Sequence, residues 1–475
     1  MDNSNSQSAD IGFSSITELN SLLGKSEISP SELAAELTNR IIEIDDCDHG
    51  LNSVLALNPK NEFQPMSEGL PLSGIPILIK DNIEAVGLPA TAGSLALTGR
   101  PVIKDAPLVK NLKDNGAFIL GSTNLSEWAN IRSGNSSSGW SAVGGLTANP
   151  WNYKYSAGGS SSGSGSAVAA GLIPAAIGTE TDGSIVCPAS LNGVVGIKPT
   201  VGRISTEGIV PISFSQDSPG PLTRNVSDAL LILEVLINQS GLVKASEDSS
   251  KIRVGVVREW LTTDQKTNDI FENQLQSLAK SGIELVEIEM APYSEQAGAD
   301  EISVLMHELK FTMDTYLANR HGNGVKSLAE VIEFNLKNSD IELAHFGQEY
   351  FELAQSTSGL TEKYHETRSR NLDWAKNTVL DPALSQVDVL IGIPYGPAWE
   401  SDLVNGDNFA SASWMTHAPA ICGYPIASLP MGFVDGLPVG LGVIAKANDE
   451  LNLARALGQL EQVLGFKDLI PTFIR

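Results

Sequence analysis

The stretch Ile75-Pro76-Ile77-Leu78-Ile79, followed at once by Lys80-Asp81-Asn82, decides the fold. A short run of apolar residues that ends at polar ones is typical of a strand buried on both faces. Such a strand needs helices on both sides of its sheet. The stretch therefore predicts a layered α/β protein in which Lys80 lies at the carboxyl end of a central strand.

Segments with helical and strand patterns alternate along the rest of the chain. Ser29-Pro30-Ser31-Glu32 has the form of a capping box with proline in the first turn, and apolar residues then recur at helical spacing, which predicts a helix over about 30–45. The alternation predicts a single domain, residues 13–475, with a central mixed, twisted β-sheet covered by helices on both faces. The other main elements expected are strands at 117–120, 173–178, 252–257, 283–289, 387–393, 426–431 and 439–445, and helices at 106–115, 227–238, 266–281 and 448–464.

Three regions depart from this alternation. Residues 1–12 are polar, and we expect a flexible tail there. Residues 123–165 are dominated by Gly, Ser, Asn and Trp, and a compact domain tolerates such a long irregular stretch mainly where it is functional. Residues 295–380 are polar, acidic and helical in pattern. We expect them to form a variable helical cover over one edge of the sheet.

Composition narrows the class of protein and its partners. The chain has 475 residues, with 31 Lys and Arg against 56 Asp and Glu, so its formal net charge is −25. This charge argues against binding to nucleic acid or to an anionic membrane surface. The apolar runs are far shorter than the ~20 residues that span a bilayer, the three cysteines are scattered, and no secretory signal is seen. We expect a cytoplasmic protein that is a monomer or a homodimer.

Several common functional sites are excluded by their missing motifs. The sequence has no phosphate-binding loop of the form G-x-x-x-x-G-K-[ST], and His307-Glu308 is not followed by the second histidine of a zinc protease. The histidines form no cluster with the spacing of metal ligands, so we expect no metal site and no cofactor. They stand at His49, His307, His321, His345, His365 and His417.

Gly159-Ser160-Ser161-Ser162-Gly163 fits the pattern G-x-S-x-G, which is the nucleophile elbow of α/β-hydrolases. That elbow requires a strand immediately before the serine. Residues 154–158, Lys-Tyr-Ser-Ala-Gly, have a poor strand pattern. A flexible loop is the better interpretation of this match.

Lys80 is the first candidate for chemistry, because sites in open α/β sheets gather at the carboxyl ends of strands. A lysine at a strand end is ordinarily a solvated charge. If Lys80 is buried, the loss of solvation lowers its pKa from the reference value of about 10.4 toward neutrality, as a general base requires. Both interpretations are open at this point.

The second candidate is the turn Gly178-Thr179-Glu180-Thr181-Asp182-Gly183-Ser184, which also follows an apolar run. Gly183 permits a tight turn, and the backbone N–H groups of Thr181, Asp182, Gly183 and Ser184 could converge on an anion. A serine at the end of such a turn has donors for an oxyanion beside it. Taken alone, the segment is equally well a polar turn between a strand and a helix.

Taken together, these motifs resemble the amidase signature family in order and in spacing. The resemblance covers the chain from about residue 15 to 465. The motifs that carry it are Gly74-Ile75-Pro76-Ile77-Leu78-Ile79-Lys80-Asp81-Asn82-Ile83, Ser156 to Ser164, Gly178 to Ile185, Gly193 to Thr200, and Ser215-Gln216-Asp217-Ser218-Pro219-Gly220-Pro221.

The resemblance implies a Ser-cisSer-Lys triad of Ser184 as nucleophile, Ser160 as bridging serine and Lys80 as base. Family members place the bridging serine 24 residues before the nucleophile, and 184 − 160 is 24. The resemblance also implies a cis peptide bond at Gly159–Ser160, an oxyanion hole of Thr181, Asp182, Gly183 and Ser184, a seryl acyl-enzyme, and no metal or organic cofactor.

Further roles follow from position within the motifs. Ser133, Gly134 and Asn135 resemble the segment whose backbone meets the substrate in this family, and Ser161 and Asp217 are expected to support the catalytic loops from behind. The cover at 295–380 is then expected near the substrate entrance. Asp217 is equally well a capping or turn residue.

The departures from the commonest family pattern bear on the substrate. Asp182-Gly183 stands where many members have Gly-Gly, and Thr179 to Pro188 looks most like peptide amidases, which act on C-terminal carboxamides. Val186 stands where the transamidating subunits usually have arginine. We expect an amidohydrolase for C-terminal peptide amides or for aryl and alkyl amides, and for carbamates and esters as well. The alternatives are a glutamine amidotransferase subunit that generates ammonia and a catalytically silent binding protein.

Overall fold

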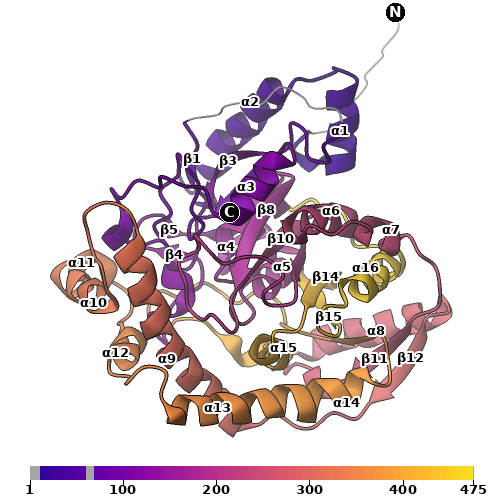
Figure 1. Ribbon diagram of the computed structural model, residues 1–475. Helices are drawn as coiled ribbons and strands as arrows, with labels where there is room; N and C mark the ends of the chain where they lie inside the picture. Colours follow the sequence, from indigo (N-terminus) through magenta and orange to yellow (C-terminus); the bar gives the residue numbers. More distant parts are fainter. Residues whose placement is uncertain (1–10, 60–68, 474–475) are drawn as a thin grey trace, which may run out of the picture.

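The computed structural model describes residues 11–59 and 69–473 (Figure 1). The predicted tail, residues 1–12, lies outside the described residues except for its last two. Ile11 and Gly12 belong to a short 3-10 helix, η1 (Ile11–Phe13), in which Gly12 is buried. The last two residues of the predicted tail are therefore part of a helical turn.

The core of the molecule is one mixed sheet of 11 strands in the order β1-β3-β2-β8-β10-β9-β14-β15-β13-β11-β12. Two small two-stranded sheets, β4-β5 and β6-β7, lie in the segment rich in Gly and Ser. The sheet is mixed, as predicted from the alternation of elements. Its strands are β1 (Val54–Leu57), β2 (Pro76–Lys80), β3 (Phe118–Thr123), β8 (Ala175–Glu180), β9 (Val195–Lys198), β10 (Ser218–Thr223), β11 (Arg253–Val257), β12 (Glu284–Ile288), β13 (Val389–Gly392), β14 (Ile426–Val434) and β15 (Leu437–Ile444), and the small sheets hold β4 (Trp140–Ser141), β5 (Gly145–Leu146), β6 (Ala148–Asn149) and β7 (Asn152–Ser156).

Both faces of the sheet are covered, because alternate residues of one strand enter different apolar clusters. In β13, Val389 and Ile391 pack into one cluster and Leu390 into another. This alternation confirms the predicted layered architecture. The helices are α1 (Ile16–Gly24), α2 (Pro30–Arg40), α3 (Pro107–Asp114), α4 (Ser162–Ala169), α5 (Val186–Asn192), α6 (Val226–Ile237), α7 (Leu242–Ser246), α8 (Gln265–Lys280), α9 (Glu295–Asn319), α10 (Leu328–Lys337), α11 (Ser339–Glu342), α12 (Glu349–Gln355), α13 (Glu362–Asp373), α14 (Asp381–Leu384), α15 (His417–Cys422) and α16 (Glu450–Leu464), with the short 3-10 and π segments η2 (Ile41–Asp45), η3 (Leu95–Leu97), η4 (Glu127–Asn130), η5 (Arg258–Trp260), η6 (Trp374–Leu380) and η7 (Phe409–Ser411).

The first predicted helix has the expected start. The Ser29 side chain accepts a hydrogen bond from the Glu32 N–H, and the Glu32 carboxylate accepts one from the Ser29 N–H, which completes the capping box. The α-helix ends at Arg40, and the predicted remainder to residue 45 is the π-helical segment η2.

Strands β2 and β8 run parallel and adjacent, and their pairing positions the site. Ile77, Leu78 and Ile79 of β2 pair with Ala175, Ala176 and Ile177 of β8. The carboxyl ends of two parallel strands meet at the same edge of a sheet. Lys80 and the turn that follows β8 are thereby brought together.

Strand β10 was not predicted, since its sequence, Ser-Pro-Gly-Pro-Leu-Thr, has the composition of a turn. It pairs antiparallel with β8 over its whole length but with β9 only at Leu222 and Thr223. Pro219 and Pro221 therefore need no N–H donor toward β9. A Cβ on Gly220 would lie 2.0 Å from the Ile197 carbonyl oxygen, so the close approach of β9 requires glycine there.

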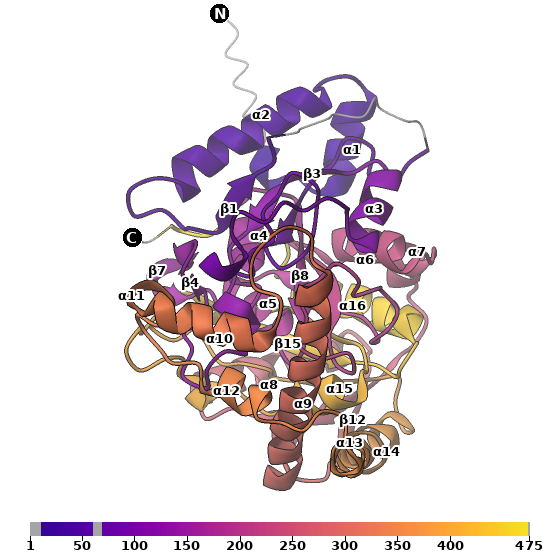
Figure 2. The ribbon, with the colours of Figure 1, turned by 60° about the vertical axis from the view of Figure 1, so that its left-hand side comes forward.

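Residues 295–380 are helical, with α9 as the longest member (Figure 2). Helix α9 contacts α10, α12 and α13. The apolar residues of α9, α10 and α12 form a cluster with Leu97, Trp128 and Ile131 from the first third of the chain. No helix of the described part of the chain combines the length and the apolar character that crossing a membrane requires.

Candidate active site

Lys80 is the last residue of β2, and its side chain is fully buried. Its Nζ lies 2.7 Å from Ser160 Oγ, 2.9 Å from Thr179 Oγ1 and 3.2 Å from the Thr179 carbonyl oxygen. Burial lowers the pKa of Lys80 to about 7, although the carboxylates of Asp217 and Glu180 oppose the shift. Of the two interpretations of this residue, the structure matches the buried one.

Ser160 lies just before α4, is fully buried, and follows a cis peptide bond, Gly159–Ser160. The neighbouring Ser161 connects this segment to the end of β8. Its hydroxyl donates to the Thr179 carbonyl at 3.0 Å and accepts from the Thr179 N–H at 3.2 Å, and its N–H donates to the Ser184 carbonyl at 3.1 Å. Ser161 thus joins the segment of Ser160 to Thr179 and to the backbone of Ser184.

The contacts of Ser161 also show that the G-x-S-x-G match at residues 159–163 is not a nucleophile elbow. A strand does precede the match, since β7 ends at Ser156, which corrects the expectation of a poor strand there. However, β7 pairs with β6 in a small separate sheet, and the hydroxyl of Ser161, the central serine of the motif, is used to hold Thr179. The arrangement is not that of an α/β-hydrolase elbow.

Ser184 lies in the turn between β8 and α5, with 9% of its surface exposed. The Glu180 carboxylate holds the far end of the turn, because it accepts hydrogen bonds from the N–H groups of Ile185 and Val186 at 2.7 and 2.9 Å. Gly183 has a φ of +77°, and a Cβ there would lie 2.3 Å from the Tyr395 hydroxyl. Only glycine fits this position.

The turn leaves backbone donors free next to Ser184. Within residues 11–59 and 69–473, no hydrogen bond uses the N–H groups of Asp182, Gly183 or Ser184. Successive free N–H groups at a turn can receive an oxyanion. Within the same residues, the hydroxyls of Ser160 and Ser184 are not hydrogen-bonded to each other, so the link between them runs through Ser161.

A cavity of about 300 Å³ opens at this turn. Thr181, Asp182 and Ser184 line it together with Gly159, the residue before Ser160. Ile131, Ile212 and Leu305 line it with apolar side chains. The rings of Tyr350 and Phe409 and the carboxyl group of Asp407 line it as well.

Ser133, Gly134 and Asn135 also line the cavity, and three of their polar groups are hydrogen-bonded within the protein. The Ser133 hydroxyl and the Gly134 N–H both donate to Glu349 at 2.7 Å, and the Asn135 N–H donates to the Ser133 hydroxyl at 3.1 Å. Glu349 is the first residue of α12. The helical region thus holds the loop that forms this wall of the cavity.

Asp217 is buried beneath the same turn. Its carboxylate accepts hydrogen bonds from the Thr181 hydroxyl at 2.6 Å and from the N–H groups of Ile212 and Ser213 at 2.8 and 2.9 Å. Burial raises the pKa of Asp217 to about 6. These bonds connect Thr181 to the loop that carries Ile212 and Ser213.

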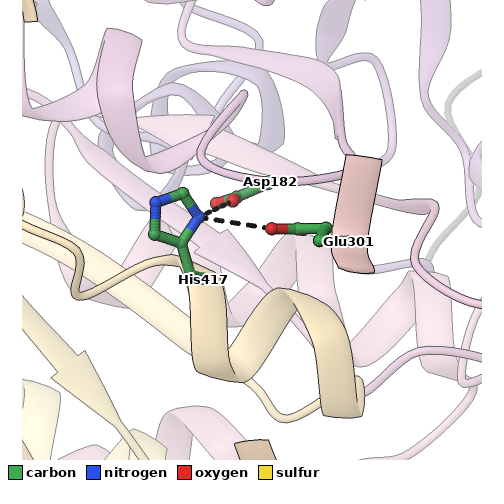
Figure 3. A group of neighbouring side chains, drawn as sticks. All are labelled: Asp182, Glu301 and His417. Carbon is green, nitrogen blue, oxygen red and sulfur yellow. Dashed lines mark hydrogen bonds and ion pairs between the residues drawn. The ribbon is translucent and has the colours of Figure 1, made fainter. Parts of the chain in front are cut away.

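One cluster was missed by the sequence analysis. His417, Asp182 and Glu301 converge on one point (Figure 3), although they are far apart in the sequence and no motif connects them. Among the described residues, this group has atoms close enough together to hold a metal ion. However, His417 Nδ1 lies 2.5 Å from Asp182 Oδ2, which is a hydrogen-bond distance. Two ligand atoms that are each about 2.0 Å from one zinc ion lie farther apart than this, so the geometry is that of an ion pair.

Comparison with known proteins identifies the family. The family model described as amidase matches residues 53–453. This chain belongs to the amidase signature family. It is therefore an amide-cleaving hydrolase, as the resemblance of its motifs implies.

Three similar proteins show the range of this family. The solved structure of a peptide amidase from Stenotrophomonas maltophilia superimposes with a TM-score of 0.88 at 36% identity, over 97% of this chain and 98% of that one. A protein of Arabidopsis thaliana named as a probable amidase is 36% identical over 388 residues, which are 78% of this chain and 72% of that protein. A glutamyl-tRNA(Gln) amidotransferase subunit from Geobacillus kaustophilus is 30% identical over 490 residues, 96% of this chain and 98% of its own length.

Proposed function

We propose that this amidohydrolase cleaves linear carboxamides through Lys80, Ser160 and Ser184. The observation that carries the proposal is the buried amine of Lys80, 2.7 Å from the hydroxyl of Ser160, on a segment hydrogen-bonded to the backbone of Ser184. A serine hydroxyl is a weak nucleophile near neutral pH and needs an adjacent base. A lysine whose pKa is about 7 is such a base.

The contacts of Lys80 support the direction of proton transfer. A neutral amine has two N–H groups and one lone pair. The two oxygens of Thr179 are both acceptors for Lys80, so they take the two N–H groups and leave the lone pair for the Ser160 hydroxyl. Ser160 then gives its proton to Lys80 and takes the proton of Ser184. A rotation of the Ser184 side chain toward Ser160 precedes this step.

The turn supports the developing charge when Ser184 attacks the amide carbonyl. The free N–H groups of Asp182, Gly183 and Ser184 are positioned as an oxyanion hole, with Thr181 beside them. Collapse of the tetrahedral intermediate breaks the C–N bond, and the leaving ammonia or amine takes the proton back along the same path. Water then hydrolyses the acyl-enzyme on Ser184. Each of these steps uses protein side chains and water.

The cavity supports C-terminal peptide amides as the main substrate class, with aryl and alkyl amides, carbamates and esters as further ones. Its apolar residues Ile131, Ile212 and Leu305 suit the side chain next to the amide, and the similar protein from S. maltophilia is named a peptide amidase. None of the described residues lining the cavity is Lys or Arg. A substrate with a free carboxylate would find no partner there, whereas a C-terminal amide is uncharged.

The helical region contributes to this cavity through Leu305 of α9 and Tyr350 of α12. We therefore assign residues 295–380 as the cover of the substrate entrance.

A glutamine amidotransferase subunit is the second candidate. The amidotransferase subunit of G. kaustophilus, which is similar over nearly the whole chain, favours it. The lack of a cationic side chain among the described lining residues opposes it, because free glutamine carries an α-carboxylate. Ammonia release from glutamine distinguishes the two candidates.

The test is ammonia release by the purified protein from acetyl-phenylalaninamide, an anilide and free glutamine. We expect turnover of the peptide amide and about a 10⁴-fold or larger loss of kcat in Ser184→Ala. A fluorophosphonate probe should label the native protein at Ser184, as located by mass spectrometry of its peptides. Ser205→Ala, at an exposed serine outside the cavity, is the control. Full turnover by Ser184→Ala would refute the proposed nucleophile, and glutamine as the best substrate would favour the second candidate.

A further inference from the structure

The cluster of Asp182, Glu301 and His417 joins three separate parts of the fold (Figure 3). Asp182 belongs to the turn that carries Ser184, Glu301 belongs to α9, and His417 is the first residue of α15. His417 Nδ1 lies 2.5 Å from Asp182 Oδ2 and 3.4 Å from Glu301 Oε2. One imidazole nitrogen is therefore shared by two carboxylates from different elements.

Charge explains why this arrangement holds. The three atoms lie within 4.8 Å of one another, so two ionised carboxylates repel each other unless a cation stands between them. Burial alone would lower the pKa of His417, but Asp182 and Glu301 raise it well above its ordinary value. His417 helps to lower the pKa of Asp182, whereas burial raises the pKa of Glu301. Loss of the proton from His417 would remove the cation that stands between the two carboxyl groups.

Other groups lie near His417 besides the two carboxylates. The ring of Tyr293 lies 5.7 Å from the imidazole, and the backbone N–H of His417 donates to the carbonyl of Trp414. Lys198 and Glu180 lie beyond Asp182. When both are ionised their charges have opposite signs, so their effects on His417 oppose each other. Tyr395, near Asp182, holds its proton because burial raises its pKa well above the ordinary value.

Glu301 also supports the turn by a second path. Its Oε1 accepts a hydrogen bond from Gln216 Nε2 at 2.8 Å, and the same nitrogen lies 3.5 Å from the Thr181 carbonyl oxygen. Thr181 and Asp182 are thus both connected to α9 through Glu301. Gly183, which has no side chain, follows them directly. The turn consequently depends on these contacts, together with Glu180 on its far side, for its position.

We propose that His417 is a positioning residue, a cation between Asp182 and Glu301 that fixes the oxyanion turn against helix α9. This inference rests on the proposed function, because it concerns the same turn. His417 touches neither the substrate nor the nucleophile. It holds the side chain of Asp182 and thereby the direction of the N–H groups of Asp182 and Gly183. It also couples this turn to the helical cover.

The first test is the kinetics of His417→Gln, Glu301→Gln and His417→Arg on acetyl-phenylalaninamide between pH 6 and 10. Removal of an oxyanion donor lowers kcat by about 10²–10³-fold, so loss of its support should lower kcat by about 10–100-fold with KM changed less than about threefold. Glu301→Gln keeps the contact between His417 and Asp182, so a smaller loss is expected. His321→Gln, at an exposed histidine, is the control.

The pH profile separates positioning from a general structural effect. The proton on His417 is present below its raised pKa and is lost above it, so native activity should fall at alkaline pH. His417→Gln should lack that alkaline decline, and its kcat should be lower than that of the native protein across the pH range. His417→Arg, which stays cationic, should also lack the decline and should recover part of kcat. In both variants the acidic limb, set by Lys80, should remain.

A second measurement does not depend on turnover. NMR of labelled histidine in Ser184→Ala should show His417 protonated at pH 7.5, and its titration should move to lower pH when Glu301→Gln is added. A neutral His417 at that pH would overturn the inference. Native kcat and an unchanged alkaline limb in His417→Gln would do the same. Tight binding of Zn²⁺ at the cluster, measured by calorimetry and lost in Glu301→Gln, would show a metal site instead. The proposed function is tested separately, because it would be contradicted by full turnover in Ser184→Ala.

Discussion

Among the described residues, Lys80 and Lys198 are buried at equivalent places, and their surroundings differ. Lys80 ends β2 and Lys198 ends β9, and both side chains are fully buried. Lys80 faces two hydroxyls and one carbonyl, whereas Lys198 Nζ donates to the carbonyls of Tyr424 at 2.6 Å and Pro199 at 3.3 Å. A hydroxyl can give up a proton and a carbonyl cannot. Burial lowers the pKa of both amines, but only at Lys80 is there a proton for the amine to accept.

The charges around the two amines differ as well. Glu180 is the largest carboxylate influence on Lys198, with Asp182 and Glu450 adding to it. At Lys80 the influence of Asp217 comes first and that of Glu180 second. Burial lowers the pKa of Lys198 and raises that of Glu180, and each of the two groups opposes the shift of the other. Glu180 in turn holds the N–H groups of Ile185 and Val186, so Lys198 supports the turn through Glu180, whereas Lys80 is the proposed base.

The largest effect expected from this comparison is on activity. Lys80→Met should lower kcat by about 10³-fold or more, since it removes the base. Lys198→Met should keep kcat within about tenfold, but it leaves Glu180 without its buried partner and should lower the free energy of unfolding by about 3 kcal/mol. Turnover of acetyl-phenylalaninamide and urea unfolding measure the two quantities. An equal loss of kcat in two folded variants would contradict the comparison.

The second prediction concerns stability against pH. Lys80 has a folded pKa of about 7, and an unfolded lysine titrates near 10.5, so between these values the unfolded chain binds the additional proton. The destabilisation caused by Lys80 is complete below pH 7 and is relieved as the pH rises from 7 to 10.5. The free energy of unfolding of the native protein should therefore rise relative to that of Lys80→Met, by about 1.4 kcal/mol per pH unit at most.

Unfolding in urea at several pH values between 7 and 9.5 measures this difference. Because both proteins retain Lys198, its own titration cancels. A difference in stability that does not change with pH over this range would mean that Lys80 stays charged in the folded state.

The sequence predicts the candidate site residues that lie in short motifs, because each motif combines a recognisable local pattern with a reactive side chain. An apolar run that ends at Lys80 predicts a strand end, and the spacing found in the family selects Ser160, from a run of three serines, as the proposed bridging residue. The main sheet and its covering helices follow from the same periodicity. Strand β10 was missed because two prolines and a glycine indicate a turn, and only the limited pairing with β9 makes them acceptable.

Contacts between distant segments had no signal in the sequence. His417 reaches Asp182 across 235 residues, and Glu349 holds Gly134 across 215. Asp182 and Gly134 lie in motifs that the sequence analysis singled out, but His417 and Glu349 have the character of ordinary surface residues. Their partners depend on how α9, α12 and α15 pack over the sheet, and hydrophobic periodicity predicts that a helix packs without predicting which polar residues meet.

The smallest effect expected is that of Thr179→Val, which removes a hydrogen bond that orients the amine of Lys80. Thr179 Oγ1 accepts hydrogen bonds from Lys80 and from Asn82 Nδ2, each at 2.9 Å. Valine has nearly the same shape, so the variant leaves one N–H of each partner without an acceptor, at a cost of about 1–3 kcal/mol. The Lys80 lone pair is then no longer fixed toward Ser160, and kcat should fall about tenfold while KM is nearly unchanged. Steady-state kinetics at pH 8 measures this, and a KM effect without a kcat effect would show that Thr179 serves substrate binding instead of the orientation of Lys80.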